Sequence, residues 1–230
     1  MRTKRLLFIT FCGLLFFLFA ALGVWQLERR IWKLALIEQV DSRLRAAPVP
    51  VPDVTKWRGY DASANDYRRV EAIGVFQNDR ETKVDALTER GAGFWLMTPL
   101  ATGSGEILVN RGFVPTDEAS WSRPQGRVIV RGLLRPTEPD GRFLRPNRPS
   151  EERWFSRDVA AIARARHLAR VAPFFIDADR SGAANEPPIG GMTVVTFRNA
   201  HLSYVITWFA LALLSAAGLV LLSRDRQKPI

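Results

Sequence analysis

The segment RNAHLSYVITWF, residues 198–209, places a histidine at the start of a long apolar run. This run extends from Leu202 to Leu222 and contains no charged side chain. About 20 apolar residues are enough for a helix to cross the hydrocarbon core of a bilayer. The segment therefore predicts a transmembrane helix over residues 202–222, with His201 at its mouth.

A second uncharged apolar run, LLFITFCGLLFFLFAALGVW, occupies residues 6–25. A cleavable signal peptide is the rival interpretation, with Ala21-Leu22-Gly23 as the cleavage site. However, the apolar core of a secretory signal is usually about 7–15 residues long, which is shorter than this run. We therefore expect an uncleaved transmembrane helix over residues 6–27.

The charges that flank the two runs predict their orientation. Three basic residues occur in each of the short tails, residues 1–5 and 223–230. Short basic tails stay in the cytoplasm, whereas long domains are translocated largely regardless of their charge. We expect two cytoplasmic tails, a helical hairpin and an extracytoplasmic domain over residues 28–201. Because no Arg-rich, Ser-rich transit segment precedes the first helix, a bacterial plasma membrane with a periplasmic central domain is favoured.

The central domain should begin with a helical stalk and continue as a sheet. Apolar residues at helical spacing follow the first run, and the prolines of APVPVPDV (47–54) end this pattern, so residues 46–67 are expected to form an extended loop. Alternating apolar residues predict strands at 67–77, 81–89, 93–101, 106–115, 127–135, 172–178 and 192–197. One helix is expected near residues 157–168, with Ser156 as its N-cap. The expected fold is an α+β domain with a mainly antiparallel sheet, which curling would close into a barrel.

The composition excludes several classes of chemistry. The only cysteine, Cys12, lies in the first apolar run, so the central domain has neither a disulfide nor a Cys/His metal cluster. No HExxH, G-x-S-x-G or phosphate-binding glycine loop occurs. The net charge of +10 comes largely from eleven arginines between residues 127 and 170. They form either a solvated surface or a face for lipid headgroups or an acidic partner. We expect neither an enzyme nor a nucleic-acid-binding protein.

His201 is the main candidate for a functional residue. Ionisable residues at a membrane boundary often mark functional sites, and imidazole is a common axial ligand of heme iron. On a helix, His201, Tyr204 or Val205, and Trp208 share one face, against which a flat apolar ring could pack. The alternative is an interfacial histidine that only anchors the helix, with Tyr204 and Trp208 in an aromatic belt.

An antiparallel hairpin brings further residues to the level of His201. Gln26 at the outer end of the first helix lies at the same depth, and Gly23 allows close approach of the two helices. The arginines just beyond them could hold carboxylates, including porphyrin propionates, or lipid phosphates. The candidate cofactor-binding residues are His201, Tyr204, Trp208, Gln26, Arg29, Arg30 and Arg198, with His201 as the candidate ligand of the heme iron.

Four segments resemble one known family. LGVWQLERRIWKLALI (22–37), LVNRGFVP (108–115), RPSEERWFSRDVAAIA (148–163) and PIGGMTVVTFRNAHLSYVITWF (188–209) are similar to the surfeit locus protein one (Shy one) family. The resemblance covers essentially the whole chain. It implies two membrane helices around an external domain and a role in assembling heme-copper cytochrome c oxidase, by binding heme a and passing it toward subunit I. Cytochrome c oxidase subunit I, heme a synthase and the lipid bilayer are the implied partners.

The resemblance also bears on single residues. His201 matches the histidine of the family's second helix, whereas Ala200 departs from the asparagine that often precedes it. The remaining matched residues are expected to be structural: a strand bend at Gly112, a buried polar tie at Asn110 and Arg111, and attachment of the helix to the sheet by Trp154 and Asp158. Two alternatives remain, namely a scaffold for oxidase subunits that does not touch heme and a membrane-anchored hydrolase that uses His167.

Overall fold

The computed structural model describes residues 2–142, 144–182, 185–193, 197 and 200–224. The chain forms two compact units. The helical unit comprises Met1–Val40 and Val195–Ile230, and the barrel unit comprises Asp41–Val194.

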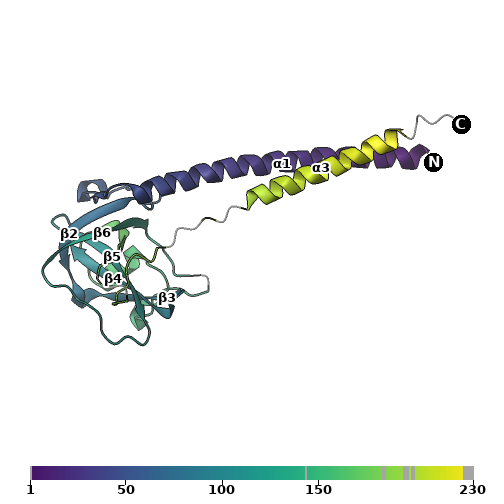
Figure 1. The fold of residues 1–230 in the computed structure, drawn as a ribbon. Helices are drawn as coiled ribbons and strands as arrows, with labels where there is room; N and C mark the ends of the chain where they lie inside the picture. The colour runs from purple at the N-terminus through teal and green to yellow at the C-terminus, as the bar shows by residue number, and fades with distance from the viewer. Residues whose placement is uncertain (1, 143, 183–184, 194–196, 198–199, 225–230) are drawn as a thin grey trace. The chain divides into compact units, whose positions relative to one another are not determined.

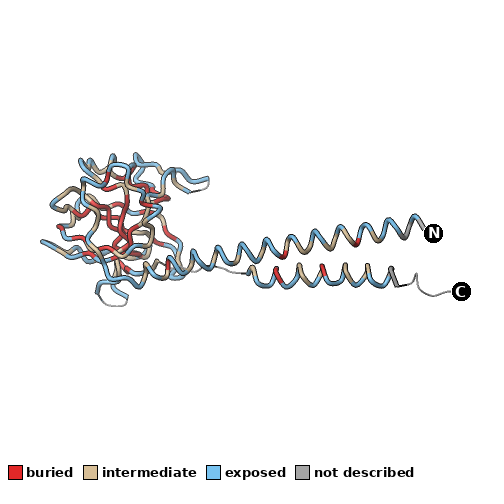
Figure 2. Tube along the Cα trace, turned by 90° about the horizontal axis from the view of Figure 1, so that it is seen from above, coloured by how far each residue is buried: buried red, intermediate tan, exposed pale blue. Residues whose placement is uncertain are grey.

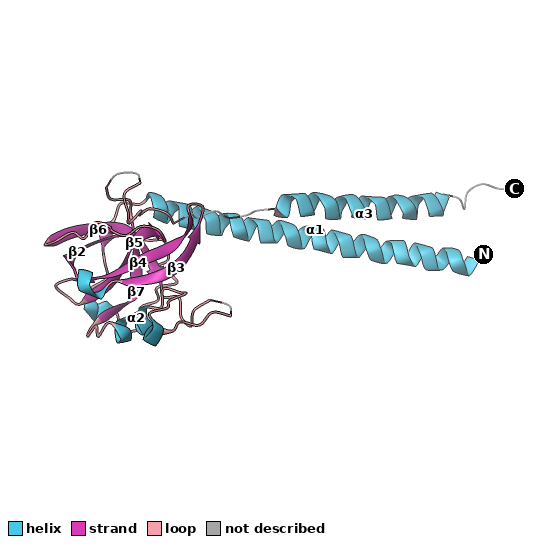
Figure 3. Ribbon diagram, turned by 90° about the horizontal axis from the view of Figure 1, so that it is seen from below, coloured by secondary structure: helices cyan, strands magenta, loops and turns pink. Residues whose placement is uncertain are grey.

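Two long helices, α1 (Arg2–Arg45) and α3 (His201–Arg224), make up the helical unit. α1 continues without a break through the residues predicted as a stalk, because its sequence carries no proline before Pro48. The two helices pack antiparallel (Figures 1 and 3): the ring of Phe19 stacks on Trp208, with centroids 5.7 Å apart, and Gly218 lies beside the sulfur of Cys12. The predicted pairing of the two apolar segments as a hairpin therefore agrees with this unit.

The outer surface of the helix pair is apolar. Side chains such as Leu14 and Phe17 are 65% and 71% exposed, and Figure 2 shows mainly exposed and intermediate residues along both helices. Both helices are long and apolar enough to cross a bilayer. An apolar surface of this extent is unfavourable in water. The helical unit is therefore consistent with a membrane-anchored protein.

In its described residues, the barrel unit contains seven strands, one α-helix of its own and three short 3-10 helices. The strands are β1 (Val49–Pro50), β2 (Arg69–Phe76), β3 (Thr82–Thr88), β4 (Gly91–Ala101), β5 (Glu106–Pro115), β6 (Arg127–Pro136) and β7 (Val171–Ala178). The helices are η1 (Val54–Lys56), η2 (Asn78–Arg80), η3 (Pro149–Glu151) and α2 (Val159–Ala165). All of the strands predicted between residues 67 and 178 are present, within about two residues of their expected ends.

The sheet closes on itself. Its strand order is β1-β2-β6-β7-β5-β4-β3, and an additional pairing joins β2 to β4. Strands β2, β6, β7, β5 and β4 therefore form a ring, with β1 and β3 attached outside it. Pairing is antiparallel except between β1 and β2 and between β5 and β7. The mainly antiparallel sheet and its closure into a barrel are confirmed.

Alternation of apolar side chains along the strands fills the barrel and covers one side of it. Inside, Val70, Leu100, Phe174 and Ile176 form one buried cluster together with Trp57. A second cluster packs α2 against the sheet through Trp154, Ile162 and Phe175. Figure 2 shows that the buried residues concentrate in this unit.

Three local expectations differ from the structure. Asp158, not Ser156, caps α2, because its carboxylate accepts a hydrogen bond from the amide of Ala161, whereas Ser156 is engaged by the preceding loop through Asn147. The predicted loop over residues 46–67 contains β1 and η1 and contributes Trp57 to the core. Of the strand predicted at 192–197, residues 194–196 lie outside the described residues, and Met192 and Thr193 are not in a strand.

Candidate functional site

The imidazole of His201 meets Gln26 across the helix pair. Nδ1 of His201 lies 2.8 Å from Oε1 of Gln26, and both side chains are half-buried. With its amide oxygen facing the ring, Gln26 can only accept a hydrogen bond, so this contact requires the tautomer in which Nδ1 carries the proton and donates it. In the neutral ring this leaves Nε2 with a lone pair, and among the described residues Nε2 makes no hydrogen bond. The site therefore presents a single, oriented imidazole nitrogen.

The next two turns of α3 carry the residues that were expected to share a face with His201, namely Tyr204 or Val205, and Trp208. Val205 is buried, whereas Tyr204 is 53% exposed, so Val205 is the residue on the face of α3 that packs within the unit. Trp208, one turn further, stacks on Phe19. The indole Nε1 of Trp208 is buried and has no hydrogen-bond partner in the described part of the chain. Trp208 thus offers a donor that a bound polar group would satisfy.

The helices also touch at Gly23, three residues before Gln26. A Cβ atom on Gly23 would lie 2.9 Å from the ring of Phe209, so this ring already fills the space next to the glycine. Gly23 therefore allows the close approach that was predicted for it. The ring of Phe209 therefore occupies the space between the two helices at the level of Gly23.

The predicted arginines are only partly assembled around the site. Arg30 follows Gln26 by four residues and therefore lies on the same side of α1. Arg29 is exposed and places its guanidinium 4.1 Å from the ring centroid of Trp32. Arg198 lies outside the described residues. The structure thus joins His201 and Gln26 and leaves the arginines as nearby cations.

This donor set is compatible with heme. A neutral imidazole with an unprotonated Nε2 is the form that ligates iron, and its other nitrogen is usually held by a second residue, as Gln26 holds it here. The buried N–H of Trp208 could hydrogen-bond a polar substituent of the ring. His201, Trp208 and Gln26 are therefore the residues of the helical unit that best fit such a group.

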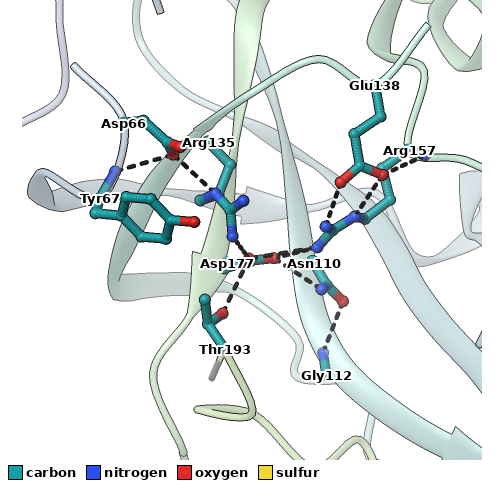
Figure 4. Close-up of polar contacts among 9 residues, drawn as sticks. All are labelled: Asp66, Tyr67, Asn110, Gly112, Arg135, Glu138, Arg157, Asp177 and Thr193. Carbon is teal, nitrogen blue, oxygen red and sulfur yellow. Dashed lines mark hydrogen bonds and ion pairs between the residues drawn. The ribbon is translucent and has the colours of Figure 1, made fainter. Parts of the chain in front are cut away.

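The barrel unit contains a separate buried polar network around Asp177 of β7 (Figure 4). The carboxylate of Asp177 accepts hydrogen bonds from Asn110, Arg135, Arg157 and Thr193, at distances of 2.8 to 3.3 Å. Only 5% of Asp177 is exposed, and the network borders a cavity of ≈ 230 Å³. These donors, two of them charged, replace the hydrogen bonds that the carboxylate would make with water, so they offset the cost of burying it.

Each arginine of the network also contacts a second carboxylate. Arg135 donates to Asp66 at 2.8 Å, and Arg157 donates to Glu138. Burial raises the pKa of Asp66, and the charge of Arg135 only partly offsets this. For Glu138, burial alone would raise the pKa, but the hydrogen bonds and charge of Arg157 outweigh burial and lower it. The network thus ties β5, β6 and β7 to the loops around them.

The motif residues of β5 have the structural roles that were expected. Gly112 has φ +133°, and a Cβ atom there would lie 2.2 Å from the backbone carbon of Ile189. Asn110 donates to Asp177 and accepts from the amide of Gly112. Arg111 is buried and bonds Glu81 at 3.2 Å. These contacts stay within the barrel unit, so they stabilise its fold.

The Asp177 network was not among the predicted sites. Its members lie at positions 66, 110, 135, 138, 157, 177 and 193, so no local motif contains them. One local signal was available: an aspartate in the apolar strand APFFIDA points to a buried carboxylate that needs partners.

His167 has a conformational role. It follows α2, is exposed and has φ +54°, the left-handed conformation that commonly ends a helix. Its backbone N–H donates to the carbonyl of Arg164 at 3.3 Å. This exposed position at the end of a helix gives no support to the alternative of a hydrolase that uses His167.

The chain thus combines two apolar helices, each long enough to cross a membrane, with a small closed β-barrel, and an imidazole site lies on the helix pair. The protein-family model of the SURF1 family matches residues 13–213 of this chain. The chain therefore belongs to the SURF1 family.

Curated relatives agree with this assignment. The chain is 37% identical over 215 residues to human surfeit locus protein 1, covering 83% of this chain and 69% of the relative. It is 36% identical over 213 residues to the rat protein of the same name, covering 83% and 67%. A SURF1-like protein of Monosiga brevicollis is 33% identical over 224 residues, covering 88% and 82%. These relatives are named after a locus and not after a reaction.

Proposed function

We propose that this protein assists the assembly of heme-copper cytochrome c oxidase by binding heme a and passing it toward subunit I. The observation that carries the proposal is the hydrogen bond of His201 to Gln26, which leaves Nε2 as an oriented ligand nitrogen. Membership of the SURF1 family supports the oxidase-assembly role through the resemblance described above. In this role the protein is a carrier and not an enzyme.

The residues of the site have distinct roles in this proposal. His201 supplies the nitrogen that would ligate the iron, and Gln26 holds the other nitrogen of the ring. The buried indole N–H of Trp208, two turns further along α3, could donate to a polar group of the porphyrin. Apolar contact between the porphyrin and the exposed face around Tyr204 would supply most of the affinity, at about 25 cal/mol per Å² of buried apolar area. Arg29, Arg30 and Arg198 remain candidate partners of the propionates.

The proposed setting is a bacterial plasma membrane, with both termini in the cytoplasm and the barrel unit in the periplasm. The short basic tails and the two apolar helices support this orientation. Subunit I of the oxidase and heme a synthase would then be membrane partners of the helical unit. A reporter that is active only outside the cytoplasm, fused to the carboxy terminus, should be inactive; activity would refute this orientation.

The test of heme handling is the absorption spectrum of the full-length protein purified from cells that make heme a. We expect bound heme in the wild type, loss or change of the spectrum in His201→Ala, and no change in His167→Ala. Wild-type stoichiometry and spectrum in a correctly inserted His201→Ala protein would refute the ligand assignment. If the wild type binds no heme but its deletion still lowers the oxidase content, the protein is a scaffold. A normal oxidase heme content in the deletion strain would refute both roles.

A further inference from the structure

The geometry points to Gln26 as a positioning residue that fixes the protonation and direction of the His201 ring. Gln26 and His201 are 175 positions apart in sequence, yet their side chains meet at 2.8 Å between α1 and α3. This inference rests on the proposed function and assigns a task to a residue that would not touch the iron itself.

The chemical argument starts from the two ring nitrogens. A neutral imidazole exchanges its proton between Nδ1 and Nε2, and only the unprotonated nitrogen can ligate a metal. The Oε1 atom of Gln26 accepts from Nδ1, which favours the tautomer with a bare Nε2. The same hydrogen bond polarises the ring and makes Nε2 a stronger donor to iron. Gln26 therefore affects both the affinity of the site and its reduction potential.

A neutral acceptor also suits the apolar surroundings of this contact. Gln26 directly follows the uncharged run 6–25, His201 directly precedes the uncharged run 202–222, and Val205 of α3 is buried one turn from His201. A carboxylate in place of the amide would bring a charge that is costly to remove from water. It would also be a stronger acceptor and would give the ring more imidazolate character. Gln26→Glu is therefore an informative variant, because its effect on the iron should oppose that of Gln26→Leu.

The rival explanation is that the hydrogen bond only ties the two helices together. A variant elsewhere on the pair separates the two explanations: Gly218→Leu crowds the sulfur of Cys12, which lies 3.6 Å from where a Cβ atom on Gly218 would be. This substitution disturbs the helix contact without touching His201. A structural tie predicts that Gly218→Leu and Gln26→Leu have the same effect on the histidine, whereas a positioning role predicts an effect only from Gln26→Leu.

The experiment uses full-length protein in detergent and two readouts. Nitrogen NMR of the heme-free protein, labelled with ¹⁵N-histidine, should show His201 protonated on Nδ1 in the wild type and in Gly218→Leu, and a mixture of tautomers in Gln26→Leu. Titration with ferric protoheme should show about a 10- to 100-fold weaker affinity for Gln26→Leu, the usual effect of losing such a partner. Gln26→Glu should bind heme with a lower reduction potential than the wild type.

The outcomes distinguish this inference from the proposed function. If His201→Ala loses ligation while both Gln26 variants keep the wild-type affinity, potential and tautomer, Gln26 does not position the ring and the proposed function stands. If His201→Ala keeps the wild-type heme spectrum, the proposed function fails. In that case a tautomer change in Gln26→Leu would still show that Gln26 orients the ring.

Discussion

Replacing Asp177 by alanine should destabilise the barrel unit severely. The substitution removes the shared acceptor of Arg135 and Arg157, whose side chains are only 16% and 14% exposed. Breaking a buried ion pair by removing one partner typically costs about 3–5 kcal/mol. Each arginine keeps a second carboxylate, Asp66 or Glu138, so we expect a loss near the lower limit, about 3 kcal/mol.

The assay is urea unfolding of the full-length protein in detergent, followed by tryptophan fluorescence. Four of the seven tryptophans belong to the barrel unit, at positions 57, 95, 121 and 154. The apolar helices remain in the detergent, so the barrel unit dominates the transition. The free energies of unfolding are compared between variants whose unfolding free energy depends on urea concentration with the same slope.

A neighbouring aspartate provides the control. Asp179 also pairs with an arginine, Arg69, but their side chains are 37% and 27% exposed. Exposed ion pairs contribute about 0–1 kcal/mol, so Asp179→Ala should cost no more than this. Equal losses in the two variants, or a loss below about 1 kcal/mol for Asp177→Ala, would refute the assignment of the Asp177 network as a stabilising core.

Three further predictions concern other parts of the molecule. The lowered pKa of Glu138 means that its contribution to stability is present above pH 4.5, the ordinary value, and is lost as the pH falls through the folded-state pKa. Glu138→Gln should therefore flatten the loss of stability below pH 4.5 in acid-unfolding curves; an unchanged curve would contradict this. Gly112→Ala should lower the unfolding free energy by at least about 2 kcal/mol in the urea assay, because a Cβ atom meets the Ile189 backbone there; a neutral effect would count against the close approach. Gly218→Cys should form an intramolecular disulfide with Cys12 on oxidation, seen as a faster band on a non-reducing gel, whereas the exposed Leu214→Cys should not.

Local patterns were sufficient to predict strands β2 to β7 of the barrel unit, but not β1 or η1. The strand EILVNRGFVP was expected at residues 106–115, and β5 has these bounds, because alternating and β-branched side chains match the pleated sheet. The cap of α2 was predicted wrongly, since serine and aspartate are both good N-caps and propensity does not decide between them. The loop contact of Ser156 with Asn147, which decides it, is tertiary.

Contacts between distant residues explain what the sequence did not reveal. That β7 pairs with β5 in parallel and lies between β5 and β6 cannot be read from local alternation, and neither can the convergence of Arg135 and Arg157 on Asp177. The His201 site was partly predictable, because pairing two apolar segments in opposite directions brings Gln26 and His201 to one level. Their hydrogen bond depends on side-chain conformations that helix depth does not determine.

The position of β7 has a consequence for incomplete chains. Among the described residues, β7 (Val171–Ala178) is the last strand of the sheet in sequence, but it lies in the ring between β6 and β5. A chain that stops between Pro136 and Val171 would therefore lack one strand of the ring. The edges of β5 and β6 that pair with β7 would be left unpaired, beside the buried Leu108 and Leu134. Such truncations should aggregate or be degraded even though four-fifths of the ring's strands have been synthesised.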